Sequence, residues 1–184
     1  MRIFRPLDKF LELSDFFQDY VKQSKTDWSH IIIHHSATKD GQTFDSTAIR
    51  KYHIETNKWQ EIGYHFLIEQ IDGQYYYVLG RPLIMNGAHS GTLVSNFFNK
   101  HGIGICCVGN FDVIKPPIDM LNKLRLLVIA LQEKFNISKD NVIGHWEVFL
   151  RLGLVFTKEA AWSKYKTCPG RLFDLDSFRS SIKI

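Results

Sequence analysis

The sequence is poor in the features that mark several classes of protein. Only 3 of its 184 residues are cysteine, and two of these, Cys106 and Cys107, are adjacent. An odd number with this spacing does not form a disulfide framework. No stretch approaches about 18 consecutive apolar residues, the length needed to span a membrane as a helix. The net charge is only +4 and blocks of like charge are missing, so no nucleic-acid partner is predicted.

Proline and glycine are also sparse, with 5 and 12 residues, which argues against disorder and collagen. Apolar residues make up 45% of the chain, as expected of one compact domain. A chain of this size can bury about 70% of its unfolded surface, so its core needs no metal to fold. A bound metal would therefore serve function.

The N-terminal residues predict an appended helix. Apolar side chains recur every three or four positions over residues 7–22, and the opposite side is acidic. This helix either packs on the domain or binds a partner or a membrane surface. Charges at Asp8, Lys9 and Glu12 interrupt the apolar run of a signal peptide, so we expect synthesis in the cytoplasm without a leader. We interpret residues 1–27 as a helical extension and 28–184 as the main domain.

The main domain alternates strand and helix patterns, which predicts an α/β fold. We expect a central mixed sheet of five or six strands with helices on both sides. An Asp-Gly pair at 72–73 predicts a hairpin. The pattern predicts strands at 28–35, 64–71, 74–79, 103–108 and 141–144, helices at 47–56, 118–135 and 172–182, and a loop at 81–100. Residues 149–166 fit a short helix or a long loop equally well.

Three metal-binding side chains lie at the ends of these elements. His34 ends the first strand, His145 ends the last, and Cys168 precedes Pro169. Two imidazoles and one thiolate form a zinc set that leaves the fourth tetrahedral position open, as in catalytic zinc sites. No short ligand motif joins them. From the residues alone, hydrogen-bonded histidines and a buried apolar cysteine remain an alternative.

Six segments occur in an order that narrows the choice. They are IIHHSATK at 32–39, IGYHFLI at 62–68, GAHS at 87–90, GIGICCVGNF at 102–111, IGHWEV at 143–148 and KTCPG at 166–170. Together they resemble the zinc-dependent N-acetylmuramoyl-L-alanine amidases, a family of phage lysozyme-type amidases and peptidoglycan recognition proteins. The resemblance covers about residues 28–180.

The resemblance implies a zinc ion held by His34, His145 and Cys168. Because side chains alternate along a strand, His34 and His35 point to opposite faces and only one of them can be a ligand. Alternation does not say which one. The resemblance assigns the first.

The same resemblance implies that Tyr64 and Lys166 are catalytic. Lys166 is two residues before Cys168, so in an extended segment both side chains face the same way. An ammonium and a phenol beside the metal would donate to the oxyanion that forms when an amide carbonyl is attacked.

Other residues have two readings each. We expect His89, in the GAHS segment, to face the substrate groove; the alternative is a hydrogen bond that stabilises its loop. Glu147 either orients a metal ligand or holds its loop. His53 and His65 are interpreted as structural, and Cys106 and Cys107 as core residues on opposite faces of a strand.

One departure from the family pattern is the long segment between His145 and Cys168, where members usually have few residues. We expect this segment, with Trp162 and Tyr165, to form a wall of the groove. It makes the position of Lys166 uncertain from sequence.

The resemblance implies a hydrolase that cleaves the amide between N-acetylmuramic acid and L-alanine in peptidoglycan or soluble muropeptides. Two settings fit a chain without a leader: a bacteriolytic phage endolysin released by a holin, and a cytosolic recycling enzyme. A monomer is expected, with no membrane partner. The alternatives are a non-catalytic peptidoglycan-binding module and a domain with structural zinc.

Overall fold

The structure is a computed structural model that describes residues 3–4, 17, 20–39, 45–92 and 94–182. Most of the helix expected at 7–22 lies outside these residues. Of its described positions, Phe17, Tyr20 and Val21 are helical, and Phe17 and Val21 are buried in the main core. A separate extension ending at residue 27 stays a prediction.

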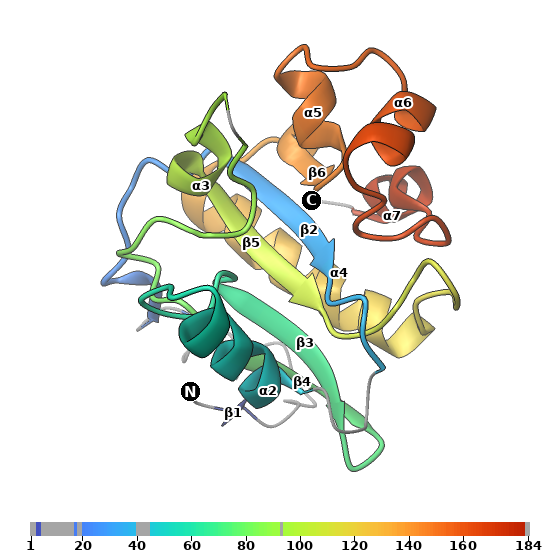
Figure 1. Ribbon diagram of the computed structural model, residues 1–184. Coiled ribbons are helices and arrows are strands. Elements are labelled where there is room, and N and C mark those ends of the chain that lie inside the picture. The colour runs from blue at the N-terminus through green and yellow to red at the C-terminus, as the bar shows by residue number, and fades with distance from the viewer. Residues whose placement is uncertain (1–2, 5–16, 18–19, 40–44, 93, 183–184) are drawn as a thin grey trace.

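The domain is built on one mixed sheet of six strands, as the sequence predicted (Figure 1). The strands lie in the order β1-β4-β3-β5-β2-β6. β5 pairs in parallel with β3 and β2, and β2 pairs in parallel with β6, whereas β4 pairs antiparallel with β1 and β3. Their bounds are β1 Ile3–Phe4, β2 His30–His35, β3 Phe66–Ile71, β4 Gln74–Leu79, β5 Gly102–Cys107 and β6 Val142–Gly144.

Helices cover both faces of the sheet. In Figure 1, α4 lies behind the sheet, α2 lies in front of it, and α5 and α6 lie together beyond β6. The described helices are α2 Ser46–Lys51, α3 Phe97–His101, α4 Ile118–Phe135, α5 Glu147–Arg151, α6 Lys158–Lys164 and α7 Leu175–Ser181, with a π-helical turn at Tyr52–Thr56 and a 3-10 turn at Lys139–Asn141. The α/β class is therefore confirmed.

Local sequence explains the central elements. The β-branched run Ile31, Ile32 and Ile33 is fully buried in β2, as expected for a strand covered on both faces. Asp72 and Gly73 both have positive φ, 50° and 81°, the backbone that a tight hairpin turn requires between β3 and β4.

The structure differs from the sequence interpretation in three segments. The predicted loop at 81–100 runs into the five-residue helix α3, and such a short helix has no periodicity to detect. The undecided segment 149–166 contains the end of α5 and all of α6. Thr157 caps α6 by accepting from the Ala160 N–H at 3.1 Å. The helix expected at 47–56 turns π-helical at Tyr52.

Among the described residues, no helix is long and apolar enough to cross a membrane.

Candidate metal centre

The parallel pairing of β2 and β6 brings His34 and His145 together. Ile33 lies opposite Gly144, and His145 follows β6 directly and donates its N–H to the Ile33 carbonyl at 3.1 Å. The two imidazole centroids are 4.6 Å apart. Strands that end side by side thus join two residues far apart in sequence.

Cys168 reaches the same place on a loop tied to both strands. Its carbonyl accepts from the Trp146 N–H at 2.9 Å, and its Sγ accepts from the His35 N–H at 3.4 Å. Asp112 clamps the loop from outside by accepting from the Thr167 hydroxyl at 2.8 Å. The same carboxylate accepts from the Arg171 N–H at 2.9 Å. The sequence analysis missed Asp112, although it follows the GNF segment directly.

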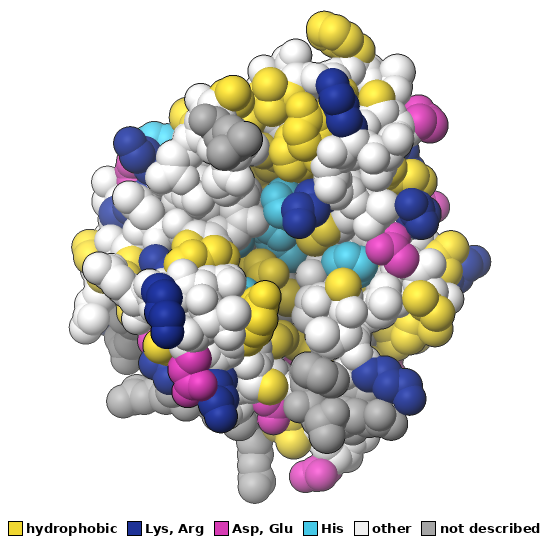
Figure 2. Space-filling view, viewed as in Figure 1, with side chains coloured by type: hydrophobic (Ala, Val, Ile, Leu, Met, Phe, Trp, Pro, Cys, Tyr) yellow, Lys and Arg dark blue, Asp and Glu magenta, His cyan; other side chains and the backbone are white. Residues whose placement is uncertain are grey.

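The ligand atoms of His34, His145 and Cys168 all lie within 4.8 Å of one another. The Cys168 Sγ is 3.5 Å from Nδ1 of His34. Zinc bonds of about 2.0–2.3 Å in a tetrahedron place ligand atoms about 3.3–3.8 Å apart, so small side-chain adjustments suffice for one ion. Figure 2 shows histidines and a basic side chain gathered around a central hollow of the surface.

The charge state of the three groups suits a cation. Burial and neighbouring histidines hold the pKa of His34 well below its usual range, and burial lowers the pKa of His145 to about 3. Both imidazoles are therefore neutral and have a lone pair to offer. Burial raises the pKa of Cys168 to about 12, against a smaller opposing effect of the His35 N–H and of Lys166. A thiolate buried here needs a cation to compensate its charge, and a divalent metal supplies one.

Tyr64 lies against the first ligand. Its ring centroid is 5.1 Å from that of His34, and burial raises the pKa of its phenol well above the usual value. The phenol therefore keeps its proton and can donate a hydrogen bond.

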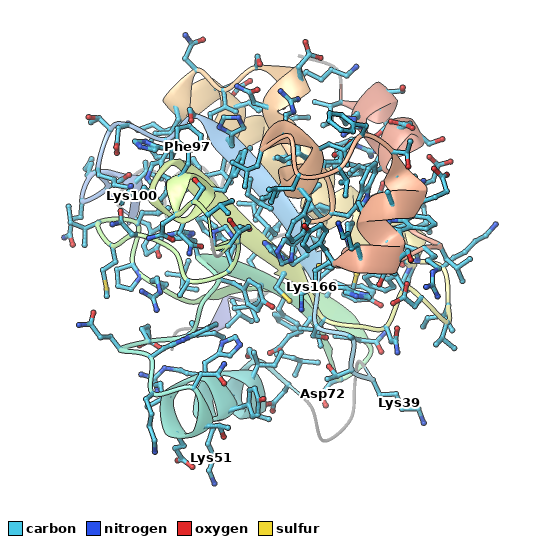
Figure 3. The ribbon with its side chains drawn as sticks, turned by 45° about the horizontal axis from the view of Figure 1, so that its top comes forward. Lys39, Lys51, Asp72, Phe97, Lys100 and Lys166 are labelled. Carbon is cyan, nitrogen blue, oxygen red and sulfur yellow. The ribbon has the colours of Figure 1, made fainter. Side chains whose placement is uncertain are left out.

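Lys166 is exposed and lies over the carboxyl ends of β2 and β5 in Figure 3. Its charge contributes to lowering the pKa of His145 and of Cys168, which places the ammonium near both. Its backbone N–H is bonded to the Ala161 carbonyl of α6 at 3.1 Å, so the end of the long segment folds back on its own helix.

A pocket of about 630 Å³ opens beside Lys166. Phe149, Leu154, Lys164 and Tyr165 line it together with three residues of a neighbouring loop, Gly91, Thr92 and Val94. The rings of Phe149 and Tyr165 stack at 4.3 Å with an interplanar angle of 7°. The segment before Cys168 thus forms a wall beside the centre.

Trp162, which the sequence also placed in this wall, is not among the residues that line the pocket. It packs instead on Trp146, with ring centroids 6.3 Å apart, at the edge of the main core. Tyr165 alone of the two expected aromatic residues faces the pocket.

The structure places the remaining candidates around the ligands. His89 is 8% exposed, with Nδ1 3.0 Å from Nε2 of His34, so little of it is left for a substrate to touch. Glu147 accepts from the Gly144 N–H at 2.8 Å and from Arg179 at 2.7 Å, and so holds the backbone next to His145. Contact of His89 with substrate stays a prediction.

His53 and His65 make hydrogen bonds that hold backbone. Nδ1 of His53 accepts from the Gly63 N–H at 3.1 Å, and Nδ1 of His65 accepts from the Gly104 N–H at 3.0 Å. Cys106 and Cys107 are fully buried in two different clusters on opposite faces of β5.

Comparison with known proteins identifies the family. The family described as N-acetylmuramoyl-L-alanine amidase matches residues 24–171. The chain belongs to this family. It is 30% identical over 150 residues to the endolysin of Klebsiella phage KP32, covering 79% of the chain and 91% of the endolysin. It is 32% identical over 149 residues to a peptidoglycan-recognition protein of Drosophila simulans, covering 77% of the chain and 68% of that protein.

A solved structure of this amidase family agrees with the fold. The endolysin amidase LysCS from Clostridium intestinale superposes with a TM-score of 0.63 at 25% identity, over 84% of this chain and 82% of that one. The similar proteins thus include amidases and recognition proteins, so family membership links the chain to peptidoglycan without deciding whether it is catalytic.

Proposed function

We propose that this amidase-family chain is a zinc-dependent hydrolase of the amide between N-acetylmuramic acid and L-alanine. The observation that carries the proposal is the convergence of His34, His145 and Cys168 within 4.8 Å, at the ends of parallel strands. Three protein ligands with one open position are typical of catalytic zinc, whereas structural zinc has four.

The donor set fits zinc because neutral imidazole and thiolate are ligands that zinc prefers. When bound, zinc would act as a Lewis acid and lower the pKa of a water molecule from 15.7 to about 7. Two neutral histidines and one thiolate would leave the centre with a net charge of about +1.

Tyr64 and Lys166 supply what the reaction needs from the chain itself. Attack on an amide carbonyl places negative charge on its oxygen, which needs donors that are already oriented. The phenol of Tyr64 keeps its proton and lies beside His34, and Lys166 brings a positive charge close to His145. Each donor is expected to contribute about 10² to 10³ in rate.

The pocket beside Lys166 supports an anionic stem peptide as the bound part of the substrate. Its lining includes Lys164 and Lys166 and no acidic residue. Phe149, Leu154 and Tyr165 give it apolar walls, which suit peptide side chains. A peptide with free carboxylates therefore matches the pocket in charge.

Purified cell walls provide the test of this function. The enzyme should release stem peptides with new L-alanine amino ends, lose this activity in EDTA, and regain it with added zinc. Peptidoglycan binding without new amino ends, in protein loaded with zinc, would overturn the proposal and favour a recognition module. The names of the relatives make that module the second candidate, but Cys168, Tyr64 and Lys166 together favour catalysis.

A structural role for zinc predicts a different result. If the ion held the fold together, EDTA would unfold the protein, and a thermal melt would show it. We expect only a modest loss of stability, because His34, His145 and Cys168 are not members of the main apolar cluster. The proposal also includes a monomeric protein. It would act either as an endolysin released by a holin or as a cytosolic enzyme that recycles muropeptides.

A further inference from the structure

The imidazole of His89 occupies space that two glycines, Gly87 and Gly104, leave free. A Cβ added at Gly87 would lie 2.4 Å from Cδ2 of His89, and one added at Gly104 would lie 2.5 Å from the same atom. Real Cβ atoms do not approach so closely, so both positions leave room for the ring. Glycine is therefore required at two positions, one of them in the central strand β5, for this imidazole to fit.

A hydrogen bond to the backbone determines which nitrogen of His89 carries the proton. Nε2 lies 3.1 Å from the carbonyl oxygen of Gly102. A carbonyl only accepts, so Nε2 is the donor. The ring is buried, at 8% exposed, and its nitrogens face a carbonyl, a hydroxyl and another imidazole instead of a carboxylate. A buried imidazole in these surroundings is neutral, so with the proton on Nε2 its Nδ1 has none.

The bare Nδ1 of His89 in turn fixes the proton of His34. Nε2 of His34 is 3.0 Å from it, and two bare nitrogens at this distance would repel each other. Nε2 of His34 is therefore a donor. The Ser90 hydroxyl lies 2.8 Å from Nδ1 of His89 and 3.4 Å from Nε2 of His34. Because Nδ1 has a single lone pair, the hydroxyl either shares it with the Nε2–H of His34 or takes it and accepts from that Nε2–H, and both arrangements leave the proton of His34 on Nε2.

We propose that His89 is a positioning residue that fixes the tautomer and ring orientation of His34 for metal binding. With its proton on Nε2, His34 presents a bare Nδ1, the nitrogen that lies 3.5 Å from the Cys168 Sγ. The hydrogen bonds that determine the two tautomers thus connect the Gly102 carbonyl to His89 and His89 to His34. The inference rests on the proposed zinc site and adds to it a residue that acts through His34 and not on the metal itself.

Nitrogen NMR of the metal-free protein tests the tautomer directly. Long-range proton–nitrogen spectra distinguish a protonated Nε2 from a protonated Nδ1 in each imidazole. We expect both His34 and His89 in the Nε2–H form in the wild-type protein. A protonated Nδ1 on His34, or a mixture of its tautomers, would overturn the proposal without any variant having to fold.

Zinc affinity, measured by competition with a chromophoric chelator, tests the consequence. Loss of a partner that orients a metal-bound histidine costs about 10- to 100-fold in affinity. We expect that loss for His89→Leu, which can neither accept from His34 nor donate to Gly102. His89→Gln keeps an acceptor and a donor and should recover most of it.

His65→Leu is the matched control, since it replaces a buried histidine nearby, 5.6 Å from His89 between ring centroids. His65 bonds to the Gly104 N–H and the Met85 carbonyl and not to His34. We expect its zinc affinity to stay within about threefold of the wild type, the size of an effect that reaches the site only through packing.

The outcomes separate this inference from the proposed function. A wild-type protein without zinc affinity would refute the zinc site itself. Tight zinc binding by the wild type and equally tight binding by His89→Leu would refute only the positioning role, and so would equal losses in His89→Leu and His65→Leu.

Discussion

The two faces of the central sheet are built from different residues, although they share the same strands. Side chains on the face toward α4, such as Ile31 and Ile33, join Leu127 of α4 in one continuous apolar cluster. On the opposite face, the described residues form two small clusters, one around Ile32 and one around Leu67. Between them lie buried polar groups, namely His34, His65, His89, Glu69 and Ser90. The α4 face thus contributes most of the apolar packing, whereas the opposite face has polar groups at positions that surround the candidate metal centre.

The Glu69 carboxylate illustrates how the polar face is satisfied. It accepts from the Ser46 N–H at 2.7 Å and from the Ser46 hydroxyl at 2.9 Å, and so bonds the start of α2 to the sheet. Buried polar groups cost free energy unless they are paired. The stability of this face therefore depends on specific hydrogen-bond partners, whereas that of the α4 face depends on how well apolar side chains fill the space. Substitutions should therefore affect activity on one face and stability on the other.

The largest effect is expected from Cys168→Ala, which removes a proposed ligand from the polar face. We expect loss of activity on cell walls to the background level and loss of tight zinc binding, with a small shift in the thermal midpoint. Cys107→Ala is the control, because Cys107 is as deeply buried but lies in the α4 cluster. Turnover retained by Cys168→Ala would contradict the proposed mechanism.

Tyr64→Phe and Lys166→Gln come next. Each removes one donor to the oxyanion and should lower kcat by about 10² to 10³, with zinc affinity unchanged within about threefold. Tyr77→Phe removes the same hydroxyl from the α4 face, where it donates to the Lys123 carbonyl at 2.9 Å. That variant should lose about 1 kcal/mol of stability and no activity. Equal kcat values in Tyr64→Phe and Tyr77→Phe would argue against a catalytic phenol.

Leu127→Ala should show the reverse behaviour. Leu127 is 1% exposed in the α4 cluster, and truncation of such a leucine costs about 2–5 kcal/mol of unfolding free energy. Urea denaturation measures this loss. At 25 °C the folded protein should keep its zinc affinity and its kcat. A change in zinc affinity larger than about threefold would show that the two faces are coupled through the sheet.

The division between the faces also explains how much could be predicted from the sequence. Apolar patterning predicted β2 and α4 because their apolar side chains are packed in the core. The Asp-Gly pair predicted the hairpin at 72–73. The candidate ligands could be named because each ends a strand or precedes a turn, but their convergence followed only from the resemblance. No period in the sequence encodes a contact between His34 and Cys168.

What the sequence could not predict depends on hydrogen bonds between distant residues. We expected His89 to face the substrate groove because it lies in a loop, and that contact stays a prediction. The space that Gly87 and Gly104 leave for its ring has no signal in the sequence. Asp112 was missed because its partners, Thr167 and Arg171, are more than fifty residues away. The helices α3 and α6 have five and seven residues, too few for a periodic signal.

A smaller effect on substrate binding is expected from Lys164→Glu. Lys164 lines the pocket beside Lys166 and is exposed, so its attraction for a stem-peptide carboxylate is worth about 1 kcal/mol. We expect KM to rise about fivefold for a muropeptide with free carboxylates. The same substrate with amidated carboxylates is the control and should show little change. Equal changes for both substrates would argue against a charge contact.

Acid provides a last test of the comparison, because it changes the charge of a histidine on the polar face. His30 shares a face of β2 with His34 and packs on Phe97 and Phe98. Burial, with smaller contributions from Arg151 and His101, lowers its pKa to about 4. The unfolded chain, with a histidine pKa of about 6.5, binds the proton first, so stability is present above pH 6.5 and falls between about pH 6.5 and 4. His30→Gln should make the decline of urea stability over this range shallower, whereas Leu127→Ala should lower the whole curve without changing its slope. A His30→Gln curve parallel to that of the wild type would show that His30 titrates alike in the folded and unfolded chain.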